Sequence, residues 1–197
     1  MTTANDPALW SSAFPWPSPD AHKHDRGRLG VVSGPALKTG AARLAARTGL
    51  RVGAGLVRIL CPPDAAPIVA ASVEAIMVDD FTSPEALARL AEPLDAVVIG
   101  PAAGLTETTA LNLAALGRTG AALIVDADAM TLFKDRTRDL FACLDRDDVL
   151  TPHEGEFERV FPKLLAEGRE AAARKAAERA GTVVVLKGRE TVIASPD

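Results

Sequence analysis

Short apolar runs alternate with longer amphipathic segments along this chain, and that alternation predicts a parallel α/β sheet. The short runs are rich in Val, Ile, Leu and Ala and end at Gly, Pro or Asp, as buried strands do. The longer segments carry apolar residues at helical spacing or a helix-start signal such as Ser83-Pro84-Glu85. The predicted strands cover residues 28–33, 56–60, 75–78, 96–99, 121–125, 149–150 and 182–186.

Helices are predicted between these strands, and a hairpin is predicted at the end of the chain. The helices begin near residues 40, 64, 85 and 106, after residue 153 and near residue 168. Thr39 is a good N-cap for the helix at 40–52, whose small-residue face is formed by Ala41, Leu44, Ala45 and Thr48. Residues 191–194 follow a short turn and predict an antiparallel partner for the strand at 182–186, on the edge of the sheet.

The two ends of the chain differ from its middle. Residues 1–20 show no helical or strand period and are predicted to form an extended N-terminal arm, whereas residues 21–197 form one domain. Trp10, Phe14 and Trp16 are too apolar for a solvated tail, so we expect the arm to pack on its own domain or on another subunit of a homo-oligomer. The chain stops in turn residues where another strand should begin, which predicts an incomplete domain with an exposed sheet edge and self-association or marginal stability.

Composition narrows the class of protein and of partner. A length of 197 residues suits one domain with a sizeable core. The net charge is -4 and the basic residues are scattered, which argues against a nucleic-acid partner. No apolar run reaches the ~18 residues of a membrane span and no signal peptide precedes the domain, so we expect a cytoplasmic protein without a membrane partner. Cys61 and Cys143 are predicted to be ordinary buried thiols.

The residues that can carry chemistry follow the predicted strands. They are Thr39–Ala42, Gly100–Gly104, Asp126–Asp128, His153–Glu156 and Lys187–Gly188. In parallel sheets the carboxyl ends of the strands lie at one edge, where ligands bind. Each group also has a purely structural interpretation, because glycines relieve turn strain, aspartates cap helices, and a single histidine or lysine often faces solvent.

Taken together, these groups predict a site that handles phosphate. Glycines let a ligand approach the backbone, a helix N-terminus attracts anions, and a lysine neutralises phosphate. A pair of carboxylates could hold Mg²⁺ or its water ligands beside the phosphates. The sequence contains neither a Walker loop nor a G-x-G-x-x-G pattern, so a P-loop enzyme or a standard dinucleotide domain is not indicated.

Six motifs in register make the chain resemble the ATP- or ADP-dependent NAD(P)H-hydrate dehydratases, which have a ribokinase-like fold. The motifs are T-G-A-A at 39–42, L-R-V-G-A-G-L-V at 50–57, I-G-P-x-x-G at 99–104, D-A-D-A at 126–129, L-T-P-H-E-G-E-F at 150–157 and V-V-L-K-G-x-x-T at 184–191. The resemblance implies a three-layer α/β/α domain with a mostly parallel central sheet, an antiparallel edge hairpin and a missing C-terminal part.

The resemblance also implies a reaction and a set of site residues. The hydroxyl of hydrated NADH or NADPH would be phosphorylated by ATP or ADP, and the ring nitrogen would then help to expel phosphate. The implied substrate-binding residues are Ala41, Gly104 and His153, with Asp128 lining the site. The implied nucleotide-binding residues are Lys187, Gly188, Arg189, Glu190 and Thr191, and Glu156 is associated with Mg²⁺ through water.

Two departures from the family pattern affect these expectations. The family has G-P-G-L-G where this chain has Gly100-Pro101-Ala102-Ala103-Gly104, which narrows or reshapes the substrate contact. The catalytic aspartate of the family lies in a G-x-G-D segment and is expected beyond Asp197, so we expect the chain itself to turn over poorly or not at all. The alternatives are a kinase of the same fold that acts on a sugar or hydroxymethylpyrimidine, and a non-catalytic nucleotide-binding remnant.

Overall fold

The predicted sheet is present, and its strand order places the predicted site exits side by side. The computed structural model describes residues 2–196, and its sheet has the order β3-β2-β1-β4-β5-β6-β7-β8. All neighbouring pairs are parallel except β7 and β8, which form the predicted antiparallel edge pair. The strands are β1 Arg28–Val32, β2 Leu56–Cys61, β3 Met77–Asp80, β4 Ala96–Ile99, β5 Ala122–Val125, β6 Val149–Leu150, β7 Val183–Leu186 and β8 Val192–Ala194.

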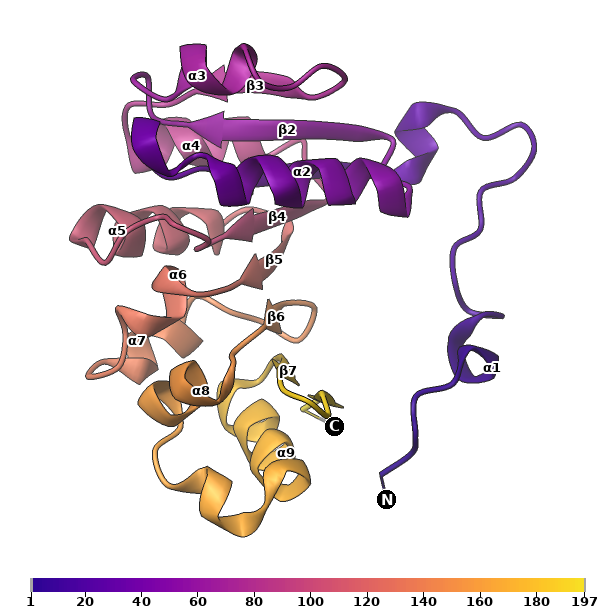
Figure 1. Cartoon of the computed structure of the whole chain (residues 1–197), viewed down its shortest axis with the longest axis vertical. Helices are drawn as coiled ribbons and strands as arrows, with labels where there is room; N and C mark the ends of the chain where they lie inside the picture. Colours follow the sequence, from indigo (N-terminus) through magenta and orange to yellow (C-terminus); the bar gives the residue numbers. More distant parts are fainter. Residues whose placement is uncertain (1, 197) are drawn as a thin grey trace.

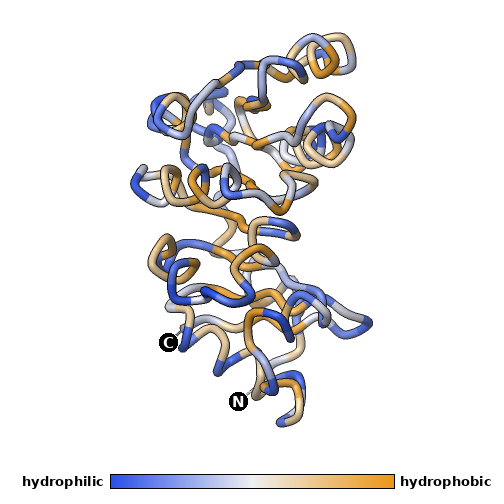
Figure 2. The backbone as a smooth tube through the Cα atoms, turned by 90° about the vertical axis from the view of Figure 1, so that its left-hand side faces the viewer, coloured by the Kyte–Doolittle hydropathy of each residue, from blue (hydrophilic) through white to orange (hydrophobic). Residues whose placement is uncertain are grey.

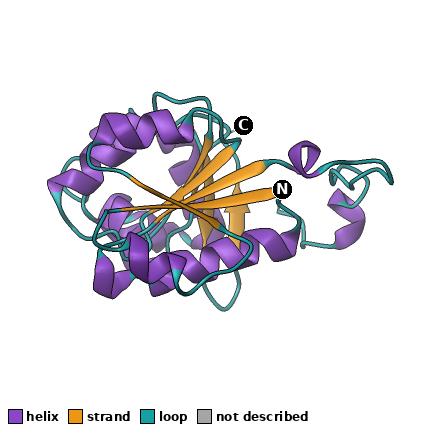
Figure 3. Cartoon of the chain, turned by 90° about the horizontal axis from the view of Figure 1, so that it is seen from above, coloured by secondary structure: helices purple, strands orange, loops and turns teal. Residues whose placement is uncertain are grey.

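Helices lie on both faces of the sheet, which confirms the three-layer α/β/α architecture (Figures 1 and 3). They are α1 Pro7–Trp10, α2 Gly40–Val52, α3 Ala66–Ala70, α4 Pro84–Ala91, α5 Glu107–Leu116, α6 Asp128–Thr131, α7 Thr137–Phe141, α8 Glu154–Val160 and α9 Arg169–Ala180. The short helices α6 and α7, which follow β5, were not predicted from the sequence. No helix in the described residues is long and apolar enough to cross a bilayer.

Alternate residues of the strands pack in two separate hydrophobic cores, one on each face of the sheet. Val32 and Leu60 pack in a core with α4, α5 and α9, whereas Val31 and Ile59 pack in a second core with α2 and α3. In the tube coloured by hydropathy, apolar segments run through the middle of the body and polar segments lie on its outer turns (Figure 2). The second core does not extend across the whole sheet. Four aliphatic residues on that face belong to neither core and are half-buried, namely Ile124, Val149, Val183 and Val185.

Helix α2 has the predicted bounds but presents a different face. Its buried residues are Ala42 and Ala46, whereas Leu44 is 67% exposed, so the face predicted from Ala41, Leu44, Ala45 and Thr48 is wrong. The reason is close packing: a Cβ on Gly49 would lie 2.3 Å from a methyl carbon of Leu29, so this side of the helix is the one in contact with the sheet. Thr39 occupies the N-cap position as predicted, although its side chain makes no capping hydrogen bond.

Three smaller predictions also need correction. Strand β3 covers Met77–Asp80 and not the predicted residues 75–78. It is therefore shifted by two residues at both ends and includes Asp79 and Asp80. Cys61 is buried as expected, but Cys143 is only half-buried. The arm is not wholly extended, because it contains helix α1.

The aromatic residues of the arm pack mainly on one another. The ring centroids of Trp10 and Phe14 are 6.0 Å apart and those of Phe14 and Trp16 are 4.5 Å apart. Trp16 is nevertheless 67% exposed, and the arm runs beside the body of the domain (Figure 1). Packing of this arm on another subunit therefore stays a prediction.

Candidate functional site

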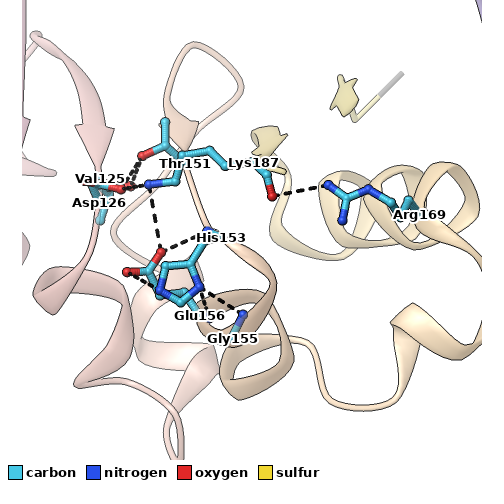
Figure 4. A network of polar contacts seen from close by, with 8 residues as sticks. All are labelled: Val125, Asp126, Thr151, His153, Gly155, Glu156, Arg169 and Lys187. Carbon is cyan, nitrogen blue, oxygen red and sulfur yellow. Dashed lines mark hydrogen bonds and ion pairs between the residues drawn. The ribbon is translucent and has the colours of Figure 1, made fainter. Parts of the chain in front are cut away.

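The carboxyl ends of β5, β6 and β7 bring together polar side chains that are far apart in the sequence (Figure 4). Asp126 follows β5, Thr151 and His153 follow β6, and Lys187 follows β7. Because these strands are parallel and adjacent, their exits share one edge of the sheet. The sequence-based expectation that these exits converge therefore holds for all three strands.

The ammonium group of Lys187 lies between two carboxylates. Its Nζ is 2.7 Å from Oδ1 of Asp126 and 4.0 Å from Oε2 of Glu156. Thr151 donates its hydroxyl to the same Asp126 oxygen at 2.8 Å. The Lys187 side chain is 42% exposed, whereas that of Glu156 is only 9% exposed. The cation is thus flanked by two protein acids, and its exposed part can be reached by solvent or by an anionic ligand.

His153 and Glu156 form a reciprocal cap at the start of α8. Nδ1 of His153 accepts hydrogen bonds from the backbone N–H groups of Gly155 at 2.9 Å and Glu156 at 3.3 Å. Glu156 in turn accepts from the backbone N–H of His153 at 2.9 Å. A ring nitrogen that accepts carries no proton, so the proton of the neutral ring is on Nε2, which lies 3.4 Å from Oε1 of Glu156. The cap fixes both side chains and leaves Nε2 as the donor of His153.

The Gly100–Gly104 loop, which follows β4, depends on its glycines for structural reasons. Gly100 has φ +124°, and a Cβ there would lie 1.8 Å from the backbone oxygen of Asp126. Gly104 has φ +93°, and its N–H donates to Oδ2 of Asp128 at 2.8 Å. Asp128 therefore orients this loop. Ala102, at a position where the family pattern has glycine, also adopts a left-handed φ of 59°, which costs roughly 1 kcal/mol.

The remaining predicted residues lie around this cluster. Ala41 is half-buried in the first turn of α2, and the loop before α2 contacts the Gly100–Gly104 loop where Gly34 faces the carbonyl of Ala102. The predicted nucleotide-binding residues after Lys187 form the exposed turn between β7 and β8 and are Gly188, Arg189, Glu190 and Thr191. The structure thus brings the predicted residues to one edge of the sheet.

Arg169, which was not predicted, braces the turn between β7 and β8. Its Nη2 lies 3.1 Å from the backbone oxygen of Leu186, 3.2 Å from that of Lys187 and 3.0 Å from that of Glu190, and its Nη1 pairs with Glu154. A basic residue in the first turn of a helix opposes the helix dipole. That unfavourable placement at the start of α9 was the signal in the sequence that could have identified Arg169.

The described residues contain no group of three or more His, Cys, Asp or Glu side chains that could hold a metal ion. Mg²⁺ usually keeps several water ligands and binds through one or two carboxylates together with substrate phosphates. Glu156 and Asp126 supply two carboxylates on either side of Lys187. The donor set therefore fits a Mg²⁺ ion held largely by water and phosphate, and does not fit a closed protein site.

Comparison with known sequences gives one consistent family. The profile of the family described as NAD(P)H-hydrate dehydratase matches residues 29–197. The bifunctional NAD(P)H-hydrate repair enzyme Nnr of Gloeobacter violaceus is 39% identical over 182 residues, covering 89% of this chain and 35% of that protein. The ADP-dependent (S)-NAD(P)H-hydrate dehydratase of Lactiplantibacillus plantarum is 32% identical over 178 residues, covering 88% of this chain and 63% of that protein.

Solved structures show the same fold. The ADP/ATP-dependent NAD(P)H-hydrate dehydratase of Bacillus subtilis, co-crystallised with ATP/Mg²⁺, superposes with a TM-score of 0.77 at 29% identity, covering 93% of this chain and 66% of that one. A ribokinase-like superfamily protein of Enterococcus faecalis gives a TM-score of 0.78 at 24% identity, covering 91% of this chain and 64% of that one, and supports the fold alone. The chain spans about a third of the length of the bifunctional relative from Gloeobacter violaceus.

Proposed function

Since this chain belongs to the NAD(P)H-hydrate dehydratase family, we propose that it binds hydrated NADH or NADPH together with ADP or ATP, for nucleotide-dependent dehydration. The observation that carries the proposal is the position of Lys187, between the carboxylates of Asp126 and Glu156 at the exits of adjacent parallel strands. A partly exposed ammonium at such an edge is suited to phosphate oxygens, and two relatives are described as ADP-dependent and ADP/ATP-dependent dehydratases.

The reaction has two stages. In the first, the hydroxyl oxygen of the hydrate attacks the terminal phosphorus of ATP or ADP, the bond from that phosphorus to the bridging oxygen breaks, and the hydroxyl proton passes to a base. In the second, the ring nitrogen lends its electron pair as the carbon–oxygen bond breaks and phosphate leaves. Loss of a proton from the neighbouring ring carbon then restores the double bond of NADH or NADPH. Such a transfer depends mainly on positioning and on neutralising charge.

The residues of this chain divide between the two ligands. We assign Lys187 to the phosphates of the nucleotide, because its ammonium can exchange Asp126 for a phosphate oxygen. The turn formed by residues 188–191 comes directly after that lysine, and we assign it to the remainder of the nucleotide. The hydrated dinucleotide is assigned to Ala41, Gly104, Asp128 and His153, the last through Nε2, which lies 3.4 Å from Oε1 of Glu156 and belongs to a half-exposed side chain.

Neither acid beside Lys187 is assigned as the base. Asp126 already accepts from Thr151 and Lys187, and Glu156 accepts from the backbone of His153. Both therefore hold and orient their neighbours. The resemblance assigns the base to a G-x-G-D segment, a pattern that residues 1–197 do not contain.

We propose that Mg²⁺ binds on the Glu156 side of Lys187, mostly through water and phosphate oxygens. When bound, the ion would neutralise charge on the phosphates. The self-association and the cytoplasmic location expected from the sequence stay predictions, and sizing chromatography at several protein concentrations tests the first of them.

The decisive test of function follows the fate of the phosphoryl group. Hydrated NADPH is incubated with the protein and ATP or ADP, and recovery of NADPH absorbance is compared with release of inorganic phosphate. Dehydration predicts that both rise in equal amounts and only when nucleotide is present, and because residues 1–197 contain no G-x-G-D segment we expect that rise to be small. A stable phosphorylated product would instead indicate a kinase. Thermal melts with each ligand are the parallel binding test, and the absence of any shift would refute ligand binding itself.

A further inference from the structure

A cavity of about 350 Å³ lies at the carboxyl end of the sheet, on the far side of the Gly100–Gly104 loop from Lys187. It opens beside the ends of the adjacent parallel strands β1 and β4. Strand β1 connects to β2 on one side while β4 begins the other half of the sheet, so this is the topological switch point of the fold. Switch points are where open α/β sheets bind ligands.

The walls of this cavity suit a flat, uncharged ring. They are mostly apolar and include Pro35, Pro62, Phe81 and Ile99. One face of α5 also lines it, through Thr108, Thr109 and Asn112, which share that face at helical spacing. None of the residues that line the cavity carries a full charge. The cavity is therefore not built for phosphate.

Asn112 is the polar group of the cavity that the fold leaves unused. It is 7% exposed, and its Oδ1 is buried without a hydrogen-bond partner. Leaving such a group unpaired costs about 1–3 kcal/mol, so it normally has a partner. The amide can turn about its last torsion and offer either its oxygen or its nitrogen to the cavity. It can then both accept and donate along one edge of a ring, which is how asparagine pairs with the N6 and N7 atoms of adenine.

We propose that this cavity binds the adenine ring of the dinucleotide substrate, with Asn112 as the residue that selects it. The inference rests on the proposed function and extends it to the half of the substrate that does not react. Strand β4 is three strand spacings, or about 14 Å, from β7, where Lys187 lies. That separation lets one extended dinucleotide place its reacting ring near Lys187 and its adenine at the switch point, with the Gly100–Gly104 loop between them.

The test compares hydrated NADPH with hydrated reduced nicotinamide mononucleotide, which lacks the adenosine half. We expect the wild-type protein to bind the dinucleotide more tightly. Asn112→Leu, which keeps the size of the side chain but removes its polar atoms, should weaken dinucleotide binding roughly 5- to 150-fold and leave mononucleotide binding unchanged. Equal affinities in the wild type, or an unchanged ratio in the variant, would overturn the proposal while leaving the proposed function intact.

A second pair of variants guards against an effect on folding. Thr108 is exposed at the rim of the cavity, and Thr108→Trp should block it. Leu111 is 51% exposed on the same helix outside the cavity, so Leu111→Trp is the matched control. Only the first substitution should lower the preference for the dinucleotide, and an equal effect of both would argue against the site.

Adenosine and inosine, titrated in the absence of any dinucleotide, separate this inference from the proposed function. If hydrated NADPH neither binds nor reacts, the proposed function fails. The adenine site would still stand if adenosine binding fell in Asn112→Leu while the weaker binding of inosine did not change. Adenosine binding that is equal in the wild type and Asn112→Leu, or absent from both, would overturn it.

Discussion

Arg169 offers the sharpest prediction, because a single side chain holds the turn that we assign to the nucleotide. Its Nη2 approaches three backbone carbonyls, those of Leu186, Lys187 and Glu190, at 3.0 to 3.2 Å. One NH₂ group has two protons, so we count two full hydrogen bonds. The perturbation is Arg169→Ala, which leaves the three carbonyls to water or to nothing.

The expected loss of stability follows from these contacts. Hydrogen bonds from a charged donor contribute about 1.5–3 kcal/mol each, which gives roughly 3–6 kcal/mol for two. That range is an upper bound, because the Glu190 carbonyl is near solvent and the Nε of Arg169 is buried without a partner in the described structure. The exposed pair with Glu154 adds at most about 1 kcal/mol. We therefore expect Arg169→Ala to lower the free energy of unfolding by about 2–3 kcal/mol.

Arg174 is the matched control on the same helix. It is half-exposed, lies 4.0 Å from Glu170 and donates to the exposed hydroxyl of Thr2, so Arg174→Ala removes only surface contacts and should change stability by less than about 0.5 kcal/mol. Urea unfolding measures both values. Hydrogen exchange supplies the local reading, because amides 187–191 should exchange faster in Arg169→Ala while those of β4 and β5 do not. Equal stability of the two variants, with unchanged exchange in the turn, would refute the bracing role.

Three further predictions concern residues outside that turn. Gly100→Ala should lower the free energy of unfolding by more than about 3 kcal/mol, because its Cβ would lie 1.8 Å from the backbone oxygen of Asp126. Gly53 has the same φ of +124° but open space around it, so Gly53→Ala is the control and should cost only the backbone strain of about 1–2 kcal/mol. Asp148→Ala should cost about 2–4 kcal/mol in chemical unfolding, because two backbone N–H groups lose their acceptor. Burial raises the pKa of Asp148, so the folded state holds its proton more tightly, and the stability that this residue contributes should fall as pH rises from the ordinary value of 3.8 through the raised one. Burial raises the pKa of Cys61 to about 11, so mass spectrometry should show alkylation of the half-buried Cys143 first and of Cys61 only on unfolding; rapid native labelling of Cys61 would contradict its burial.

The order of apolar runs was sufficient to predict the fold and the convergence of the strand exits. Buried parallel strands must be apolar on both faces, and parallel pairing alone places their ends at one edge. Strand β3 was located only approximately, because it is one of the two edge strands and carries Asp79, which pairs with Arg58 of the neighbouring strand β2 at 2.8 Å. An edge strand with charged residues has a weaker apolar signal.

The features that the sequence did not predict depend on contacts between distant segments. Arg169 reaches carbonyls that lie 17 to 21 residues further along the chain. The buried face of α2 was set by the close approach of Gly49 to Leu29, which a helical period alone does not encode. The proposed role of Asn112 depends on the cavity that forms where α5 lies beside the switch point of the sheet. Local patterns specify elements, whereas such contacts follow from how the elements pack.

The most direct test of the central claim is a calorimetric titration of ATP, with Mg²⁺ present, into the wild-type protein and Lys187→Met. Loss of a charge-assisted contact to phosphate predicts an affinity roughly 10- to 150-fold lower in the variant. Lys175→Met, which removes an exposed lysine of α9 paired with Glu167, should bind ATP as the wild type does. If Lys187→Met binds ATP as tightly as the wild type does, the cluster of Lys187, Asp126 and Glu156 is not the phosphate site.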